Sequence, residues 1–179
     1  MSVFRCFTEK REGYDIEARS ILRDLRDFLG ISGLEFVRVL NRYDIEGISE
    51  DIYLSARVTV FAEPQTDNIY DEIAPGYSKG CRTLVVEALP GQYDQRADSC
   101  AQCIAILARS ECPSVQTAKA YMFYGNISDV DMDKLRGYLI NPVESREAAD
   151  EKPETLAIAY PEPKPVETVD GFNEANESG

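Results

Sequence analysis

Residues 89–104 read LPGQYDQRADSCAQCI, and the rest of the chain is organised around this stretch. A Pro-Gly turn leads into a polar cluster of the kind that begins helices, where Asp94 or Asp98 can accept hydrogen bonds from free backbone N–H groups. Beyond the cluster, apolar residues recur at steps of three and four, which puts them on one face of a helix. The pattern predicts a helix from about residue 94 to 109.

An earlier segment of the chain carries the same apolar face. Its members are Ala18, Ile21, Leu22, Leu25, Phe28 and Leu29, and adding 79 to each number gives Ala97, Cys100, Ala101, Ile104, Leu107 and Ala108. The same offset takes Tyr14-Asp15 to Tyr93-Asp94 and Ser20 to Ser99. The match predicts an internally duplicated chain with a first helix at 15–29, after which Gly30 provides a left-handed cap.

The hydrophobic pattern predicts further elements in both halves. We expect a helix at 49–56, a short strand at 68–70, and strands at 3–8, 34–40, 83–89, 117–124 and 156–160. Two stretches stay open. Residues 43–45 either continue the preceding strand after a bend or return as a hairpin partner, and residues 58–61 are either the last turn of a helix or a strand.

The offset between the halves changes along the chain. Between the strands it is 81, which sets Val37-Arg38-Val39 against Ala118-Lys119-Ala120 and Tyr43 against Tyr124. It returns to 79 where Ile48-Ser49-Glu50 lies over Ile127-Ser128-Asp129. Insertions in loops produce such small shifts of register.

Each half thus reads as strand, helix, strand or bent strand pair, helix, strand. Two such units predict an α+β fold with antiparallel sheets, helices packed on one face and pseudo-twofold symmetry. We expect one domain at 1–160, with halves at about 1–66 and 80–160. Residues 161–179 follow as a linker, which begins with the stiff, proline-rich composition PEPKPVETV.

Composition bounds the partners and the compartment. The 179 residues are 44% apolar, enough for one sizeable core, and the formal net charge of -13 argues against nucleic acid or an anionic membrane as partner. No run approaches the roughly 20 apolar residues of a membrane span, and the charged N-terminus does not resemble a signal peptide. Five cysteines, an odd number, fit reduced thiols, so we expect a cytoplasmic protein.

The residue inventory excludes several chemistries. The chain has no histidine, which removes Ser-His-Asp and Cys-His systems and histidine metal sites, and it has no phosphate-binding glycine motif. Cys100-Ala101-Gln102-Cys103 matches a redox motif, which would require an exposed Cys100 with a lowered pKa. The duplication instead places Cys100 on the buried helix face opposite Ile21 and predicts a structural cysteine. A zinc site would need further ligands at suitable spacings, so we expect no metal.

The polar cluster at the start of the 94–109 helix is the candidate site. Its members are Asp94, Gln95, Arg96 and Ser99. An arginine beside a helix N-terminus can meet an anion or the carboxylate of a partner. The alternative is a surface capping cluster in which Asp98 contacts Arg96.

Three segments carry a family resemblance. Residues 89–99 (LPGQYDQRADS), 41–48 (NRYDIEGI) and 138–147 (YLINPVESRE) resemble segments of the single-chain phosphoribosylformylglycinamidine synthases, in particular the clostridial type. The resemblance runs from the first strand to about Phe172. In that family a ligase of purine biosynthesis converts formylglycinamide ribonucleotide to formylglycinamidine ribonucleotide, with ATP and with glutamine as amido donor.

The resemblance implies a role for this part of such an enzyme. The N-terminal domain of the family resembles two copies of a small separate subunit, which agrees with the 79-residue offset. A linker, synthase domains that bind ATP and magnesium, and a glutaminase domain follow it. We therefore expect an N-terminal docking domain whose partners are the synthase and glutaminase domains of the same longer chain, with no catalytic residue and no cofactor of its own.

Within that role, we expect Gln95, Arg96 and Ser99 to face the synthase domain near its ribonucleotide site or its ammonia route. The alternative function is a free-standing regulatory or scaffold module that binds a small effector at the seam between the two halves.

Overall fold

The computed structural model describes residues 2–157, which form an antiparallel sheet of six strands together with four α-helices. In chain order the elements are β1 (Phe4–Lys10), α1 (Ile16–Asp27), β2 (Leu34–Glu46), α2 (Glu50–Ala56), the π-helical turn η1 (Arg57–Phe61), β3 (Asp67–Asp71), β4 (Arg82–Ala88), α3 (Gln95–Ala108), β5 (Ser114–Gly125), α4 (Asp129–Leu139) and β6 (Ser145–Glu147). The predicted α+β class is confirmed. Within residues 2–157, no helix combines the length and the apolar character that crossing a bilayer requires.

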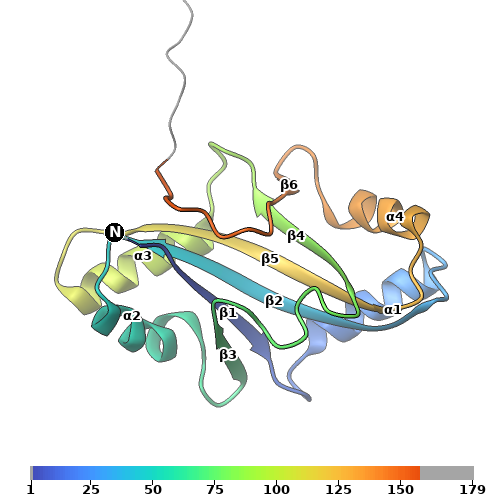
Figure 1. Cartoon of the computed structure of the whole chain (residues 1–179), viewed down its shortest axis with the longest axis horizontal. Helices are drawn as coiled ribbons and strands as arrows, with labels where there is room; N and C mark the ends of the chain where they lie inside the picture. Colours follow the sequence, from blue (N-terminus) through green and yellow to red (C-terminus); the bar gives the residue numbers. More distant parts are fainter. Residues whose placement is uncertain (1, 158–179) are drawn as a thin grey trace, which may run out of the picture.

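The strands lie in the order β3-β1-β2-β5-β4-β6. The two longest strands, β2 and β5, run side by side through the middle of the molecule (Figure 1). They pair from Glu46 opposite Ser114 to Leu34 opposite Gly125. We expected antiparallel sheets, and the structure has one, because the pairing of β2 with β5 joins all six strands into a continuous antiparallel sheet.

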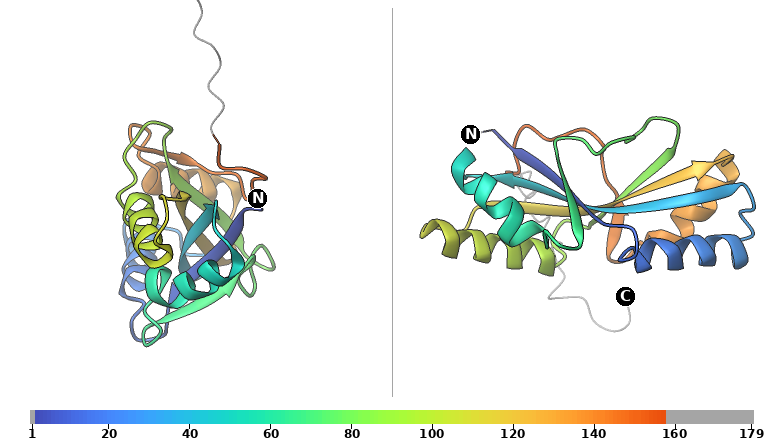
Figure 2. Two further views of the ribbon diagram at one scale, coloured as in Figure 1. Left: turned by 90° about the vertical axis from the view of Figure 1, so that its left-hand side faces the viewer. Right: turned by 90° about the horizontal axis from the view of Figure 1, so that it is seen from below.

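All four helices lie on one face of this sheet (Figure 2), as expected. They form two groups with separate apolar cores. At one end, Leu25 of α1 and Met132 of α4 pack on Val37 and Phe123. At the other end, α2, η1 and α3 cover Tyr43 and its neighbours, with Ile104 of α3 fully buried.

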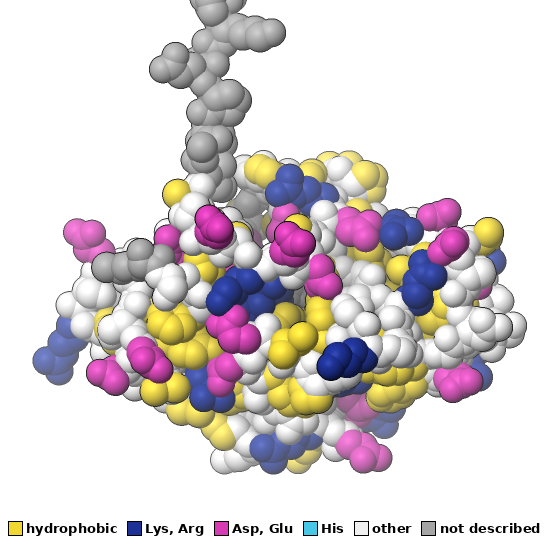
Figure 3. All heavy atoms as spheres, viewed as in Figure 1, with side chains coloured by type: hydrophobic (Ala, Val, Ile, Leu, Met, Phe, Trp, Pro, Cys, Tyr) yellow, Lys and Arg dark blue, Asp and Glu magenta, His cyan; other side chains and the backbone are white. Residues whose placement is uncertain are grey.

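No helix of residues 2–157 covers the opposite face of the sheet. Phe7, Leu40 and Met122 form its core, and the loop residues Ala74 and Tyr77 pack on them. Residues 148–157 cross the same face, where the backbone carbonyls of Ala149, Asp150 and Glu151 accept hydrogen bonds from buried arginines. Figure 3 views this face and shows basic side chains gathered near its centre with acidic ones around them.

The structure settles the two open stretches. β2 is one unbroken strand through residues 43–45, and residues 57–61 continue α2 as a π-helical turn. The short strand at 68–70 is confirmed as β3. Apart from β2, which extends six residues beyond the predicted 34–40, the other predicted helices and strands within residues 2–157 occur with bounds that shift by at most three residues, as helix and strand ends commonly do.

The structure differs from the prediction at two strands near the end of the described residues. β6 was not predicted, because Ser145–Glu147 lacks β-forming residues and is held by main-chain pairing with β4. Of the predicted strand at 156–160, Leu156 and Ala157 are not in a strand, while residues 158–160 lie outside the described residues. The predicted linker at 161–179 also lies outside them.

The offset of 81 between the strands is wrong. Val37 faces the helices, whereas Ala118, its partner at that offset, belongs to the core of the opposite face. Tyr43 and Tyr124 differ in the same way. Side chains of a strand alternate between the two faces of the sheet. At the observed pairing of β2 with β5, an offset of 81 therefore matches a residue on the helix-covered face with a residue on the opposite face.

Candidate functional site

Asp94 fixes the start of α3 to the sheet. Its Oδ1 accepts a hydrogen bond from the backbone N–H of Ala97 at 3.0 Å, so it is the N-cap that the sequence predicts. Its Oδ2 accepts a second bond, from the hydroxyl of Thr117 on β5, at 2.7 Å. The preceding turn contains Gly91 at φ +87°, a left-handed conformation that glycine adopts without strain. The carboxylate therefore holds both the helix and the strand.

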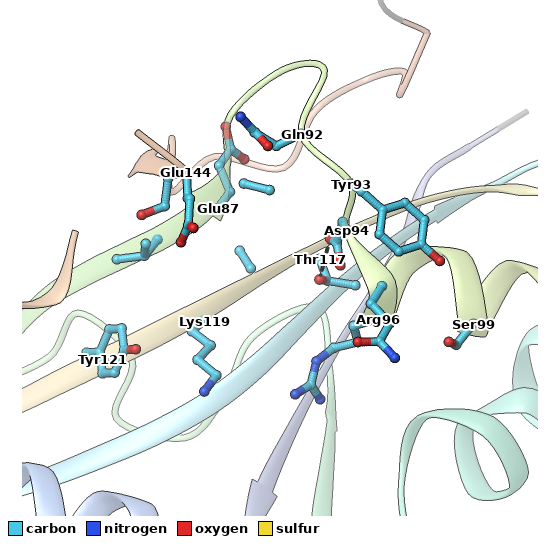
Figure 4. A pocket seen from close by; sticks show the side chains of 15 residues that line it. Glu87, Gln92, Tyr93, Asp94, Arg96, Ser99, Thr117, Lys119, Tyr121 and Glu144 are labelled. Atoms are coloured by element: carbon cyan, nitrogen blue, oxygen red, sulfur yellow. Dashed lines mark hydrogen bonds between the residues drawn. The ribbon is translucent and has the colours of Figure 1, made fainter. Parts of the chain in front are cut away.

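The four predicted site residues line one cavity of about 720 Å³ between the start of α3 and strands β4 and β5 (Figure 4). Asp94 is half-buried, whereas Gln95, Arg96 and Ser99 are exposed. The structure thus brings Asp94, Gln95, Arg96 and Ser99 to one place. Thr117 and Lys119 of β5 line the same cavity.

Arg96 reaches from α3 to the sheet. Its Nη1 donates a hydrogen bond to the hydroxyl of Tyr43 on β2 at 3.2 Å. Burial raises the pKa of Tyr43, so the hydroxyl stays neutral and accepts this bond. In the part of the chain that the structure describes, no carboxylate forms a salt bridge with Arg96.

The contact between Asp98 and Arg96, the alternative for this cluster, is not formed. Asp98 instead accepts hydrogen bonds from Tyr93 and from Gln102, both at 2.8 Å. The reason is geometric: Arg96 points toward Tyr43, while Asp98 lies two residues further along the helix and so on another side of it.

A polar row crosses the middle of the sheet between the two helix groups. Thr8 of β1 pairs with Asn41 of β2, and Asn41 pairs with Lys119 of β5. Lys119 forms a salt bridge with Glu17 of α1. The row separates the apolar core under α1 and α4 from the one under α2 and α3.

A second cavity, of about 850 Å³, lies on the other side of this row, between the start of α1 and strands β1 and β2. Its cations are paired. Arg38 binds Glu9 through two bonds of 2.6 Å, and Lys10 lies 2.7 Å from Asp67. Glu17 of this cavity occupies the position that the 79-residue offset relates to Arg96. Glu17 near the start of α1 and Arg96 near the start of α3 therefore carry opposite charges.

Cys100 does not lie in the environment that a redox cysteine needs. Cys100 is 6% exposed, and burial raises its pKa to about 11, whereas a redox cysteine needs a lowered pKa. Cys103, three residues further along α3, is exposed. Cys100 is a packing residue of the core that includes Ile104. Residues 2–157 contain no group of three or more Cys, Asp or Glu side chains arranged to hold a metal ion.

Sequence reasoning missed three residues of the site: Tyr43, Thr117 and Lys119. Thr117 and Lys119 line the cavity, and Tyr43 accepts the hydrogen bond from Arg96. The pairing of β2 with β5 brings them together by setting Tyr43 opposite Thr117. The one local signal is Lys119, a charged residue between two alanines in the strand. With a guanidinium, an ammonium and hydroxyl groups, the cavity is suited to hold and orient a ligand or a partner side chain.

Comparison of the chain with protein-family models, with curated proteins and with solved structures finds no match.

Proposed function

We propose that this chain is the N-terminal docking domain of a phosphoribosylformylglycinamidine synthase, the ligase that converts formylglycinamide ribonucleotide to formylglycinamidine ribonucleotide with ATP and glutamine. The family resemblance of residues 89–99, 41–48 and 138–147 is the origin of the proposal. The domain organises the synthase and glutaminase domains of the longer chain. ATP and magnesium bind in the synthase domains, and the catalytic groups belong to the domains that follow.

The arrangement of the strands supports a duplicated small subunit within this domain. Read from either edge, the sheet runs β3-β1-β2 or β6-β4-β5, so each strand has a counterpart in the other half. The helix N-caps repeat at the sequence offset of 79: Asp15 and Asp94 precede α1 and α3, and Ser49 and Ser128 precede α2 and α4. A pseudo-twofold axis between β2 and β5 would relate the two halves.

The observation that carries the docking role is the exposed polar cluster at the start of α3. Gln95 and Ser99 are exposed there, and Arg96 has no salt-bridge partner within residues 2–157. A carboxylate of the synthase domain would form a salt bridge with such an arginine. We place this cluster against the synthase domain, near the ribonucleotide site or the ammonia route.

A complementation experiment tests the proposal. The 179-residue chain is mixed with the separately produced remainder of the synthase, and glutamine- and ATP-dependent product formation is measured. Restored activity supports the docking role, while no binding and no activity contradict it. Arg96→Ala should then raise the apparent KM or uncouple glutamine hydrolysis from product, whereas Arg26→Ala, at an exposed arginine in the last turn of α1, should change neither.

A second candidate function is a regulatory or scaffold module that binds a small effector at the seam between the halves. The two cavities beside the polar row at Asn41 and Lys119 favour it. A saturable response of the isolated chain to a small ligand, without any complementation of the synthase, would favour this function over docking.

A further inference from the structure

We propose that the cavity at the start of α3 binds a small organic anion through a single phosphate or carboxylate group, with Arg96 and Lys119 as its cationic contacts. This inference rests on the second candidate function, the effector module, and names the chemistry of the effector.

The first support is the polar row in the middle of the sheet, at the boundary between the two halves. Asn41 and Lys119 are half-buried in the middle of the sheet, on the face where apolar side chains pack beneath helices at either end. The described helices leave this row beside two cavities rather than covering it. Polar groups of a ligand can form hydrogen bonds with this polar row, which an apolar ligand would leave unsatisfied.

Strand geometry brings the two cations together. The guanidinium of Arg96 lies at the hydroxyl of Tyr43, and Tyr43 is directly opposite Thr117. Lys119 follows two residues after Thr117 on the same face, a step of roughly 7 Å along a strand. Figure 4 shows Arg96 and Lys119 extending from α3 and β5 on the same side of the sheet. An anion between them would meet both charges.

The neighbouring carboxylates are already engaged. Asp94 accepts bonds from Ala97 and Thr117, and Glu87 binds Arg146 at 2.8 Å. Glu17 pairs with Lys119 from the side of α1. Arg96 forms no salt bridge with a carboxylate of residues 2–157, and its one hydrogen bond there goes to a neutral tyrosine, so its remaining N–H groups can bind an anion.

The cavity also limits the size and the charge of the rest of the ligand. Its volume of about 720 Å³ is within the range of small-molecule sites. Glu144 lies at the edge away from Arg96 (Figure 4). Its charge disfavours a polyanion, so the ligand should carry one anionic head on a neutral or cationic body.

Helix α3 itself is not the anion site. The backbone N–H of Ala97 at its start is occupied by Asp94, whose own negative charge opposes an anion at that point. Binding must therefore depend on the side chains of Arg96 and Lys119. That dependence makes the proposal testable by substitution.

The experiment is an NMR titration of the ¹⁵N-labelled 179-residue chain with phosphoethanolamine, glycerol 3-phosphate and, as a polyanion, citrate, at constant ionic strength. We expect saturable shifts at the start of α3 with the two monophosphates and weaker binding of citrate. Arg96→Gln should weaken binding at least tenfold, while the control Arg26→Gln leaves it unchanged. Glu17→Gln, which frees Lys119 from its salt bridge, should strengthen it.

The outcomes separate the ligand chemistry from the functions above. No saturable shift, or equal binding by Arg96→Gln in a chain with unchanged melting temperature, overturns the anion site. Binding of neutral compounds alone at the seam would keep the effector module but overturn its anion specificity. The complementation assay bears only on the docking role, because it uses the remainder of the synthase.

Discussion

Arg5 and Asp44 face each other on adjacent strands and form a two-point ion pair inside the protein. Nε and Nη2 of Arg5 lie 2.6 and 2.8 Å from the two carboxylate oxygens, and the side chains are 4% and 2% exposed. Arg42 approaches the same carboxylate at 3.3 Å. One buried carboxylate therefore forms ion pairs with two buried guanidinium groups.

We predict that Asp44→Asn destabilises the protein strongly. Removing one partner of a buried pair leaves an uncompensated charge, at a typical cost of about 3–5 kcal/mol. Urea unfolding should show a lowered midpoint with little change in slope. Asp129→Asn, which breaks the exposed pair with Arg82, is the matched control and should leave the midpoint nearly unchanged. Similar midpoints for the two variants would contradict a structural role for the buried pair.

The helices of this fold can be predicted from the sequence, whereas the segment that covers the other face of the sheet cannot. The apolar positions from Ala97 to Ile104 repeat with helical spacing, so α3 is visible locally. Arg5, Arg42 and Asp44 instead look like solvent-facing residues of half-exposed strands. They are buried because residues 148–157 return over them, and that polar segment has no hydrophobic pattern that would place it there.

A second prediction compares the two helix caps at the 79-residue offset. Asp94 makes a cap hydrogen bond and also holds Thr117, whereas Asp15 makes no side-chain cap bond to α1. Asp94→Ala should therefore cost about 2 kcal/mol of unfolding free energy. Asp15→Ala, measured in the same urea titration, should cost clearly less. Equal losses would show that the cap bond and the bond to Thr117 together add no stability at Asp94.

Cysteine reactivity provides a third prediction. At pH 8, a thiol reagent should label the exposed Cys103 and Cys112 quickly. Cys6 and Cys100 should react only on unfolding, because they are buried and desolvation raises the pKa of Cys6 to about 12 and that of Cys100 to about 11. Mass spectrometry of timed samples identifies the labelled positions. Rapid labelling of Cys100 in the native protein would revive the redox interpretation.

Stability should also fall at alkaline pH. Burial raises the pKa of Cys100 from 9.0 to about 11, so between these values the folded state keeps a proton that the unfolded state has lost. The stabilisation is complete below about pH 9 and is lost as the pH rises toward 11. Cys100→Ala should therefore show a shallower decline of unfolding free energy between pH 9 and 11 than the unsubstituted chain. An unchanged slope would contradict the assignment.

Only the contiguous part of the candidate site could be predicted from the sequence. Asp94, Gln95, Arg96 and Ser99 stand within six positions of one another, and capping preferences mark the first of them. Tyr43 and Thr117 come together through the register of β2 against β5, a long-range pairing that no local pattern encodes. The side chain that Arg96 contacts was therefore outside the reach of sequence analysis.

The last prediction concerns two glycines of opposite character. Gly125, at the end of β5, has φ +122°, and a Cβ there would overlap the carbonyl oxygen of Gly33 and lie 2.9 Å from the backbone N of Glu35. Gly125→Ala should therefore lower the melting temperature markedly, because the rigid backbones of β2 and β5 would have to separate. Gly137, exposed within α4, has nothing within 4 Å of such a Cβ, and Gly137→Ala should stabilise the protein by about 1 kcal/mol. Thermal unfolding followed by circular dichroism compares the two directly. A neutral Gly125→Ala variant would mean that the close approach of the two strands is not required by the fold.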